Sequence, residues 1–147
     1  MKKALTKTQQ RKKEHLELCL DPTSVTGRSG TGLDHYSFVH NALPELDIEE
    51  LDVSTSFLEK QLKAPILISS MTGGFELARR VNRNLASAAQ QLGLAMGVGS
   101  QRVAIEAPSV ADSFEVRDVA PDILLLGNLG AVQLNYGYTI DHCRKAV

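Results

Sequence analysis

The chain has 147 residues, is 43% hydrophobic and carries a net charge of −1, so it can bury one ordinary core. This charge balance excludes a global attraction to nucleic acid or membrane surfaces, and no apolar run approaches the ~18 residues that span a bilayer. Cys19 and Cys143 lack metal-ligand spacing. We therefore expect reduced thiols and a cytoplasmic protein.

The first 13 residues hold six Lys or Arg and no acid, and no apolar segment follows them as in a secretory signal. Two interpretations stay open: a solvated basic tail, or a segment near Arg11 and Lys12 that folds over an anionic ligand. Residues 14–20 suit a short helix or strand, and residues 21–32, rich in Gly, Ser and Thr, suit a loop. We assign residues 1–64 to an N-terminal extension.

The pattern becomes regular after this extension. Pro65–Ser70 predicts a fully buried strand, and a helix is expected from about Phe75 to Leu92 with Gly93 as its C-terminal cap. Further strands are predicted at Leu94–Gly99 and Ile123–Leu126. The strand starts lie 29 residues apart, which indicates a repeating βα unit and a parallel sheet with helices outside it.

Two α/β architectures repeat this unit: the open doubly wound sheet and the closed TIM (β/α)₈ barrel. Here every predicted strand ends in a polar, glycine-containing turn, as expected when loops around a barrel rim face one site, and we favour the barrel. Residues 65–147 would form its first three βα units. Because eight units need roughly 230 residues, we expect the sequence to be truncated.

Three glycine-containing turns are the main functional signal: residues 71–74, 97–100 and 127–130. Glycines let backbone N–H groups approach an anion closely, and a helix start adds partial positive charge. We therefore expect these turns to form one side of a ligand pocket that includes a phosphate site.

Individual side chains near these turns suit an anionic ligand. Ser100, Gln101 and Arg102 combine a hydroxyl, an amide and a guanidinium, whose planar fork suits phosphate or carboxylate. The Asn128 amide could satisfy backbone groups or bind a planar heterocycle. Asn82 is an unusual choice in a helix, and we expect it or Asn84 to pack against neighbouring backbone.

Five segments together resemble one known family, type 2 isopentenyl diphosphate isomerase, the flavin-dependent form. The likeness runs from about Arg11 to the end of the chain. The segments that carry it, in order, are Arg11–His15, Asn41–Glu45, Ser70–Gly74, Gly99–Arg102 and Gly127–Ala131.

The resemblance implies an FMN-bound barrel that interconverts isopentenyl and dimethylallyl diphosphate by flavin-assisted proton transfer. It also implies flavin reduction by NADPH, Mg²⁺ that helps hold the diphosphate, and a homo-oligomer at full length, without nucleic acid or membrane partners. It assigns no catalytic residue or metal ligand within this chain, since later strands would supply the metal contact. We expect the isolated chain to be inactive.

The same resemblance assigns binding roles to particular positions. FMN contacts are expected from Met71, Thr72, Gly73, Ser100 and Asn128. Substrate diphosphate contacts are expected from Arg11, Lys12, Ser100, Gln101 and Arg102.

Two alternatives remain. One is a different FMN-dependent barrel, an oxidoreductase of hydroxy acids or similar substrates; the basic Arg11-Lys12 pair argues against it, because a diphosphate needs more cations than a carboxylate. The other is a non-catalytic phosphate-binding module or an inert fragment.

Overall fold

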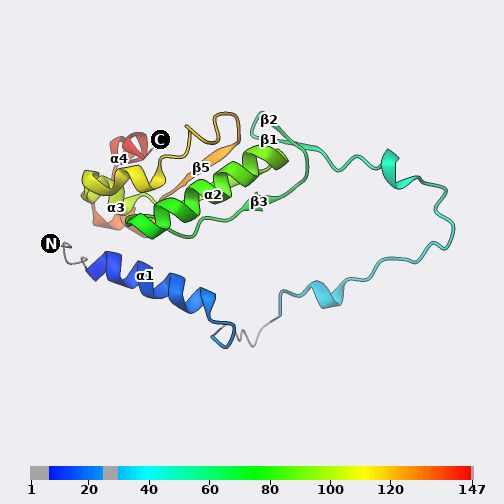
Figure 1. Ribbon diagram of the computed structural model, residues 1–147, viewed down its shortest axis with the longest axis horizontal. Helices are drawn as coiled ribbons and strands as arrows, with labels where there is room; N and C mark the ends of the chain where they lie inside the picture. The colour runs from blue at the N-terminus through cyan, green and yellow to red at the C-terminus, as the bar shows by residue number, and fades with distance from the viewer. Residues whose placement is uncertain (1–6, 25–29, 147) are drawn as a thin grey trace.

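The structure is a computed structural model and describes residues 7–24 and 30–146 (Figure 1). Its α-helices are α1 (Lys7–Leu20), α2 (Glu76–Leu92), α3 (Arg102–Glu106) and α4 (Ile140–Lys145). Its 3₁₀ helices are η1 (Leu33–His35), η2 (Ile48–Glu50), η3 (Pro108–Phe114) and η4 (Ala131–Tyr136). Its strands are β1 (Thr55–Phe57), β2 (Lys60–Leu62), β3 (Leu67–Ile68), β4 (Ala95–Ser100) and β5 (Leu125–Asn128).

The strands form two small sheets. Strands β1 and β2 make an antiparallel hairpin, and β3, β4 and β5 pair in parallel in that order, so β4 is central. The parallel pairing predicted from the repeat is therefore present. Helix α2 packs against both β4 and η3. The main core contains residues of α2, β4, α3 and η3 and of the segment after η3: Ala86, Ala89, Met96, Val98, Val103, Phe114, Val116, Ala120 and Ile123.

The predicted fold class needs correction. The described residues form two small sheets with helices, one of two strands and one of three, and they close no barrel. Closure requires each strand to pair on both sides, whereas β3 and β5 each pair only with β4. Residues 7–24 and 30–146 therefore form an α/β arrangement with an open three-stranded parallel sheet.

The first predicted strand differs most from the structure. Only Leu67 and Ile68 are in β3, and Ile66 and Leu67 remain 53% and 40% exposed, so the prediction of a fully buried strand is wrong. An unbroken apolar run indicates burial on both faces. At this edge of the sheet, the described residues do not cover both faces of β3.

Other elements lie close to their predicted bounds. Helix α2 begins one residue after Phe75, and Gly93 ends it in the left-handed conformation with φ of 63°, which confirms the predicted cap. Strand β5 begins two residues after Ile123. These shifts are ordinary uncertainties of element ends.

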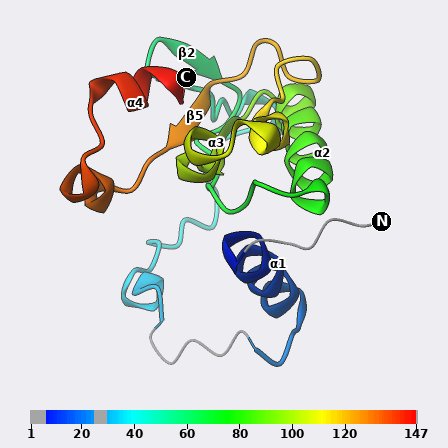
Figure 2. The same ribbon diagram turned by 90° about the vertical axis from the view of Figure 1, so that its left-hand side faces the viewer.

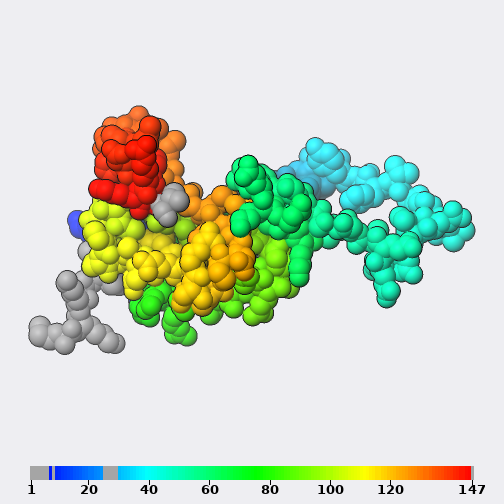
Figure 3. Space-filling model, turned by 90° about the horizontal axis from the view of Figure 1, so that it is seen from above, coloured from blue at the N-terminus to red at the C-terminus, as the bar shows by residue number. Residues whose placement is uncertain are grey.

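The basic N-terminal segment is helical. In α1, Leu16 is 8% exposed and packs with Phe75 and Ala78 at the start of α2. Figures 1 and 2 both show α1 beneath this end of α2. Residues 33–54 instead project from the body (Figure 3). Part of the predicted 21–32 loop, residues 25–29, lies outside the described residues.

None of the helices within residues 7–24 and 30–146 combines the length and apolar character needed to cross a bilayer.

Candidate functional site

A small cavity of about 220 Å³ lies where three parts of the chain meet: α1, the β4–α3 junction, and the segment from the end of β5 into η4. Its lining contains three cations and no carboxylate: Arg11, Lys12, Ser100, Arg102, Val103, Asn128, Gly130 and Gln133. Pockets that enclose drug-sized ligands measure ~300–1,000 Å³. This smaller, cationic cavity suits a group the size of phosphate or diphosphate.

Lys12 is the most unusual side chain in this cavity. Its Nζ atom is buried and has no hydrogen-bond partner among the described residues, and it lies 5.3 Å from the centre of the Phe114 ring. Burial, followed by the charges of Arg102 and Arg11, lowers the pKa of Lys12 to about 8. A bound anion would relieve both effects, because it supplies an opposite charge to a poorly hydrated ammonium.

The strand ends place the neutral donors of the site. Ser100 at the end of β4 is in register with Asn128 at the end of β5, and the Gln101 N–H donates to the Asn128 carbonyl over 2.8 Å. Arg102 then begins α3, with its Nε 3.8 Å from Glu106 Oε1 and its side chain 32% exposed. The exposed carboxylate leaves most of the guanidinium charge available to the cavity.

The turn at residues 71–74 serves packing more than the sequence suggests. Two N–H groups expected to face an anion are used internally, one in this turn and one in the turn at residues 97–100: Gly74 donates to Ser113 Oγ over 2.6 Å, and Gly99 donates to the Thr72 carbonyl over 3.2 Å. A Cβ on Gly73 would lie 1.8 Å from Phe114 Cε1. The predicted phosphate cradle of backbone N–H groups is therefore wrong for these two amides.

The structure brings five of the nine predicted site residues together in one cavity. Met71 is 55% exposed and outside the cavity lining, while Thr72 and Gly73 are buried. Gln101 is 5% exposed, and its Nε2 donates to the Gly99 carbonyl over 3.1 Å, so its amide also lies outside the lining. The predicted residues that do line the cavity are Arg11, Lys12, Ser100, Arg102 and Asn128.

Two residues of the cavity lining, Val103 and Gln133, were not predicted from the sequence. Gln133 is only 7% exposed and Val103 is 7% exposed. Val103 carries no chemical signal in the sequence. Gln133 offered a weak one, since it is an amide that follows the third glycine-containing turn by three residues.

Thr72 is a second buried polar group with an unused atom. It is 4% exposed, and its Oγ1 has no hydrogen-bond partner among the described residues. A buried hydroxyl without a partner costs about 1–3 kcal/mol. A ligand that reached this hydroxyl would recover that free energy.

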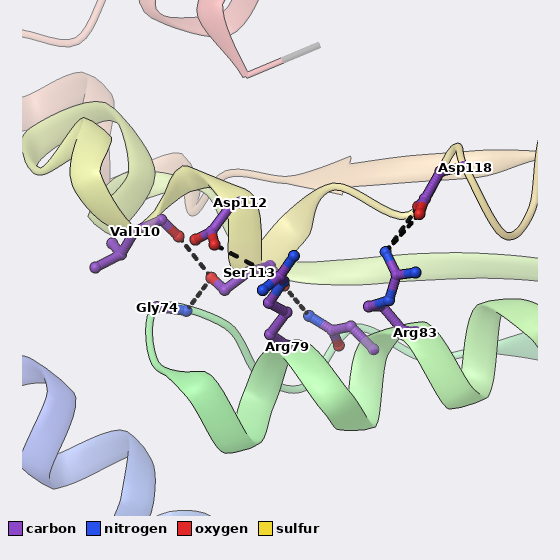
Figure 4. Close-up of polar contacts among 8 residues, drawn as sticks. Gly74, Arg79, Arg83, Val110, Asp112, Ser113 and Asp118 are labelled. Atoms are coloured by element: carbon purple, nitrogen blue, oxygen red, sulfur yellow. Dashed lines mark hydrogen bonds and ion pairs between the residues drawn. The ribbon is translucent and has the colours of Figure 1, made fainter.

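A larger cavity of about 1000 Å³ lies on the helix side of β4, with cations and carboxylates both in its lining. Figure 4 shows two of its ion pairs: Arg79 with Asp112 at 3.7 Å, and Arg83 with Asp118 at 2.7 Å. Because these charges pair within the protein, the larger cavity is a poorer anion site than the smaller one.

No three His, Cys, Asp or Glu side chains within the described residues gather closely enough to hold a metal ion. His15, the histidine nearest the basic pair in sequence, is exposed and is not part of the cavity lining.

Comparison with known proteins finds relatives that share one name. No protein-family model matches the chain. Proteins named isopentenyl-diphosphate delta-isomerase from Nostoc sp., Synechococcus sp. and Deinococcus radiodurans are 52%, 59% and 53% identical to it over 140, 138 and 137 residues. These matches cover 95%, 94% and 93% of the chain, and the chain spans 40% of the length of each relative.

The comparisons correct the sequence-based assignment to the type 2, flavin-dependent form. The relatives' names state the isomerase activity and give neither a type nor a flavin. Because the 140 matched residues are 40% of the Nostoc protein, that relative is about 350 residues long. The similarity is therefore to proteins that carry the unqualified name isopentenyl-diphosphate delta-isomerase, and it does not support the type 2 specification.

Proposed function

We propose that this chain is part of an enzyme that interconverts isopentenyl diphosphate and dimethylallyl diphosphate, and that its cationic cavity binds the diphosphate group. The observation that carries the proposal is the convergence of Arg11, Lys12 and Arg102 on one small cavity. Identities above 50% with proteins named for this activity support the choice of substrate.

The charge of the cavity agrees with a diphosphate. A diphosphate ester carries two or three negative charges near neutral pH, and the lining offers three cations and no carboxylate to balance them. Arg102 can donate two parallel hydrogen bonds to phosphate oxygens, and Lys12 contributes a compact charge. Ser100, Asn128 and Gln133 add neutral donors. This set binds two phosphate groups more completely than it would bind a single carboxylate.

The reaction requires a proton to be added at one carbon of the isoprene unit and another to be removed two carbons away. The diphosphate takes no part in this bond rearrangement, so it serves as the anchor that fixes the alkene relative to the proton donor and acceptor. In this proposal the residues of the cavity bind and orient the substrate.

The cofactors FMN, NADPH and Mg²⁺ remain predictions. Thr72 fits a ligand contact through its buried, unpartnered hydroxyl, and Ser100 and Asn128 present polar groups at neighbouring strand ends. A reduced flavin, when bound, would supply proton transfer next to the alkene. Titration of the intact protein with FMN tests this prediction: unchanged flavin fluorescence and absorbance would contradict it.

The isomerase proposal is tested with the intact protein. The protein is incubated with isopentenyl diphosphate, in the presence and in the absence of FMN, NADPH and Mg²⁺. We expect dimethylallyl diphosphate to form, and chromatography with mass spectrometry detects it. Arg102→Gln should raise KM for the diphosphate more than tenfold, because charge-assisted hydrogen bonds contribute about 1.5–3 kcal/mol. Arg80→Gln, at an exposed position on α2, is the matched control and should leave KM unchanged. Absence of product under every condition would refute the proposal.

A further inference from the structure

A buried polar network joins α2, η3 and the turn at residues 72–74. Asn82 on α2 is 3% exposed, and its Nδ2 donates to the Thr72 carbonyl over 3.2 Å and to the Ser113 carbonyl over 2.9 Å. Ser113 is 2% exposed; its hydroxyl accepts the Gly74 N–H and donates to the Val110 carbonyl over 2.7 Å. Figure 4 shows Ser113 between Gly74 and Val110.

Asn82 and Ser113 are unexpected residues for these positions on packing grounds alone. Asparagine is a poor helix former, and a buried amide costs free energy unless its groups are paired. Ser113 uses its hydroxyl as donor and acceptor at once, and Asn82 uses both amide hydrogens. The groups that these bonds hold are the backbones of Thr72 and Gly74, which fixes the turn against η3.

The fixed turn contacts the N-terminal helix that supplies two of the cavity's cations. The Gly74 carbonyl accepts a hydrogen bond from Gln9 Nε2 over 3.0 Å. Val103 fills most of the space beside Gly74, since its Cγ1 would lie 2.8 Å from a Cβ built there, and Lys12 borders the same space, with its Nζ 3.7 Å from that Cβ position. Phe114, next to Ser113, covers Gly73 on one side and faces the Lys12 ammonium.

Asn82 and Ser113 therefore influence the position of Lys12 through a short series of contacts. Asn82 and Ser113 hold Gly74 and, through the backbone of η3, Phe114. Those two residues are the surface against which the first part of α1 and the Lys12 ammonium lie. Without the Ser113 hydroxyl, the Gly74 N–H would lose its acceptor and the turn would shift to find another.

We propose that Ser113 and Asn82 are positioning residues of the anion site, which hold Gly74 and Phe114 so that Lys12 faces the cavity. Neither residue touches the cavity, and both act through the backbone of the turn. The inference rests on the proposed function in one respect: it takes the anion at the cavity to be the diphosphate of the substrate.

The test uses Ser113→Ala in the intact protein, with two readouts. Inorganic pyrophosphate affinity, measured by calorimetry, should fall up to about tenfold, because a turn and a Lys12 side chain that have lost their support must be ordered again on binding, and ordering one such side chain costs about 0.5–1.5 kcal/mol. The acetylation rate of Lys12 as a function of pH, measured by mass spectrometry, should give a higher apparent pKa than in the wild type, because a displaced ammonium is better hydrated. Ser113→Thr, which keeps a hydroxyl, should restore both readouts at least in part.

The control is Arg83→Gln, which removes a different contact from the same helix, the ion pair with Asp118, and leaves the turn untouched. It should change neither readout. If Ser113→Ala does not fold, Ser113→Cys, of similar shape but a weaker acceptor, replaces it. Wild-type pyrophosphate affinity and wild-type Lys12 reactivity in a folded Ser113 variant would overturn the inference. If the wild type itself fails to bind pyrophosphate, the proposed function fails, and Lys12 reactivity alone decides the positioning role.

Discussion

Anion binding in the cavity should be accompanied by proton uptake at Lys12. In the free protein, burial and the neighbouring Arg102 and Arg11 lower the pKa of this ammonium to about 8. A diphosphate beside Nζ would favour the charged form and raise the pKa towards its usual value of 10.5. Binding and protonation are then linked, and each promotes the other.

The size of the effect follows from the pKa of about 8. Lys12 is roughly 90% protonated at pH 7, half protonated at pH 8 and roughly 10% protonated at pH 9. If the complex holds a fully protonated Lys12, uptake is about 0.1 proton at pH 7, 0.5 at pH 8 and 0.9 at pH 9. Over the same range, the pyrophosphate affinity should lose up to about tenfold from this residue alone.

The assay is titration calorimetry of the intact protein with inorganic pyrophosphate, in buffers of different ionisation enthalpy at pH 7, 8 and 9. Lys12→Arg is the control, because a guanidinium keeps the charge and does not titrate in this range. Its proton uptake measures the contribution of pyrophosphate and of all other groups, and the difference from wild type isolates Lys12.

One calorimetric result would refute proton uptake by Lys12 on anion binding. If wild type and Lys12→Arg both bind pyrophosphate and take up the same number of protons at pH 8, then the Lys12 ammonium does not meet the anion.

Four further outcomes are expected. The free energy of unfolding should rise between pH 8 and 10.5 relative to a Lys12→Met variant, because the unfolded state binds the proton more tightly in that window; denaturant titrations check this. Gly99→Ala should lower the free energy of unfolding by about 1–3 kcal/mol or more, since its Cβ would lie 2.4 Å from the Thr72 carbonyl oxygen; a midpoint equal to wild type would contradict the geometry. Thr72→Val should leave thermal stability equal or higher, as it removes an unpartnered hydroxyl, and should weaken FMN binding if the flavin contacts it. Arg102→Gln should reduce pyrophosphate affinity by tenfold or more at low ionic strength, with no loss seen in the exposed control Arg80→Gln.

Local chemistry explains which elements could be predicted from the sequence. Helix α2 has a strong 3.6-residue apolar period and a glycine after its last turn, so both its existence and its end were predictable. The prediction of a fully buried strand at Pro65–Ser70 was wrong, because an unbroken apolar run is typical of a strand that is covered on both faces. Here β3 pairs on one side only, and its side chains stay partly exposed.

The candidate site, too, could be predicted only in part from the sequence. Arg11, Lys12, Ser100, Arg102 and Asn128 were predicted as binding residues, and they do line one cavity. Their roles were assigned by resemblance, and the sequence could not show that Lys12 Nζ is buried near the ring of Phe114, 102 residues away along the chain.

The sequence also could not show which groups lie next to the glycines of the predicted turns. A glycine after a strand predicts close approach of something to the backbone, but not what approaches. At Gly73 it is the Phe114 ring and at Gly99 it is the Thr72 backbone, so both glycines are explained by packing within the chain. Asparagine inside a helix was more informative: we expected Asn82 or Asn84 to pack against neighbouring backbone, and the two carbonyl partners of Asn82 confirm this for Asn82.

Diphosphate binding in the small cationic cavity is tested most directly by a crystal structure of the intact protein with isopentenyl diphosphate. We expect both phosphate groups in the cavity between α1 and the ends of β4 and β5, with oxygens in hydrogen-bond contact with Lys12 Nζ and the Arg102 guanidinium. A diphosphate bound elsewhere, for example among Arg79, Arg83 and Arg117 in the larger cavity, with Lys12 still unpartnered, would contradict it.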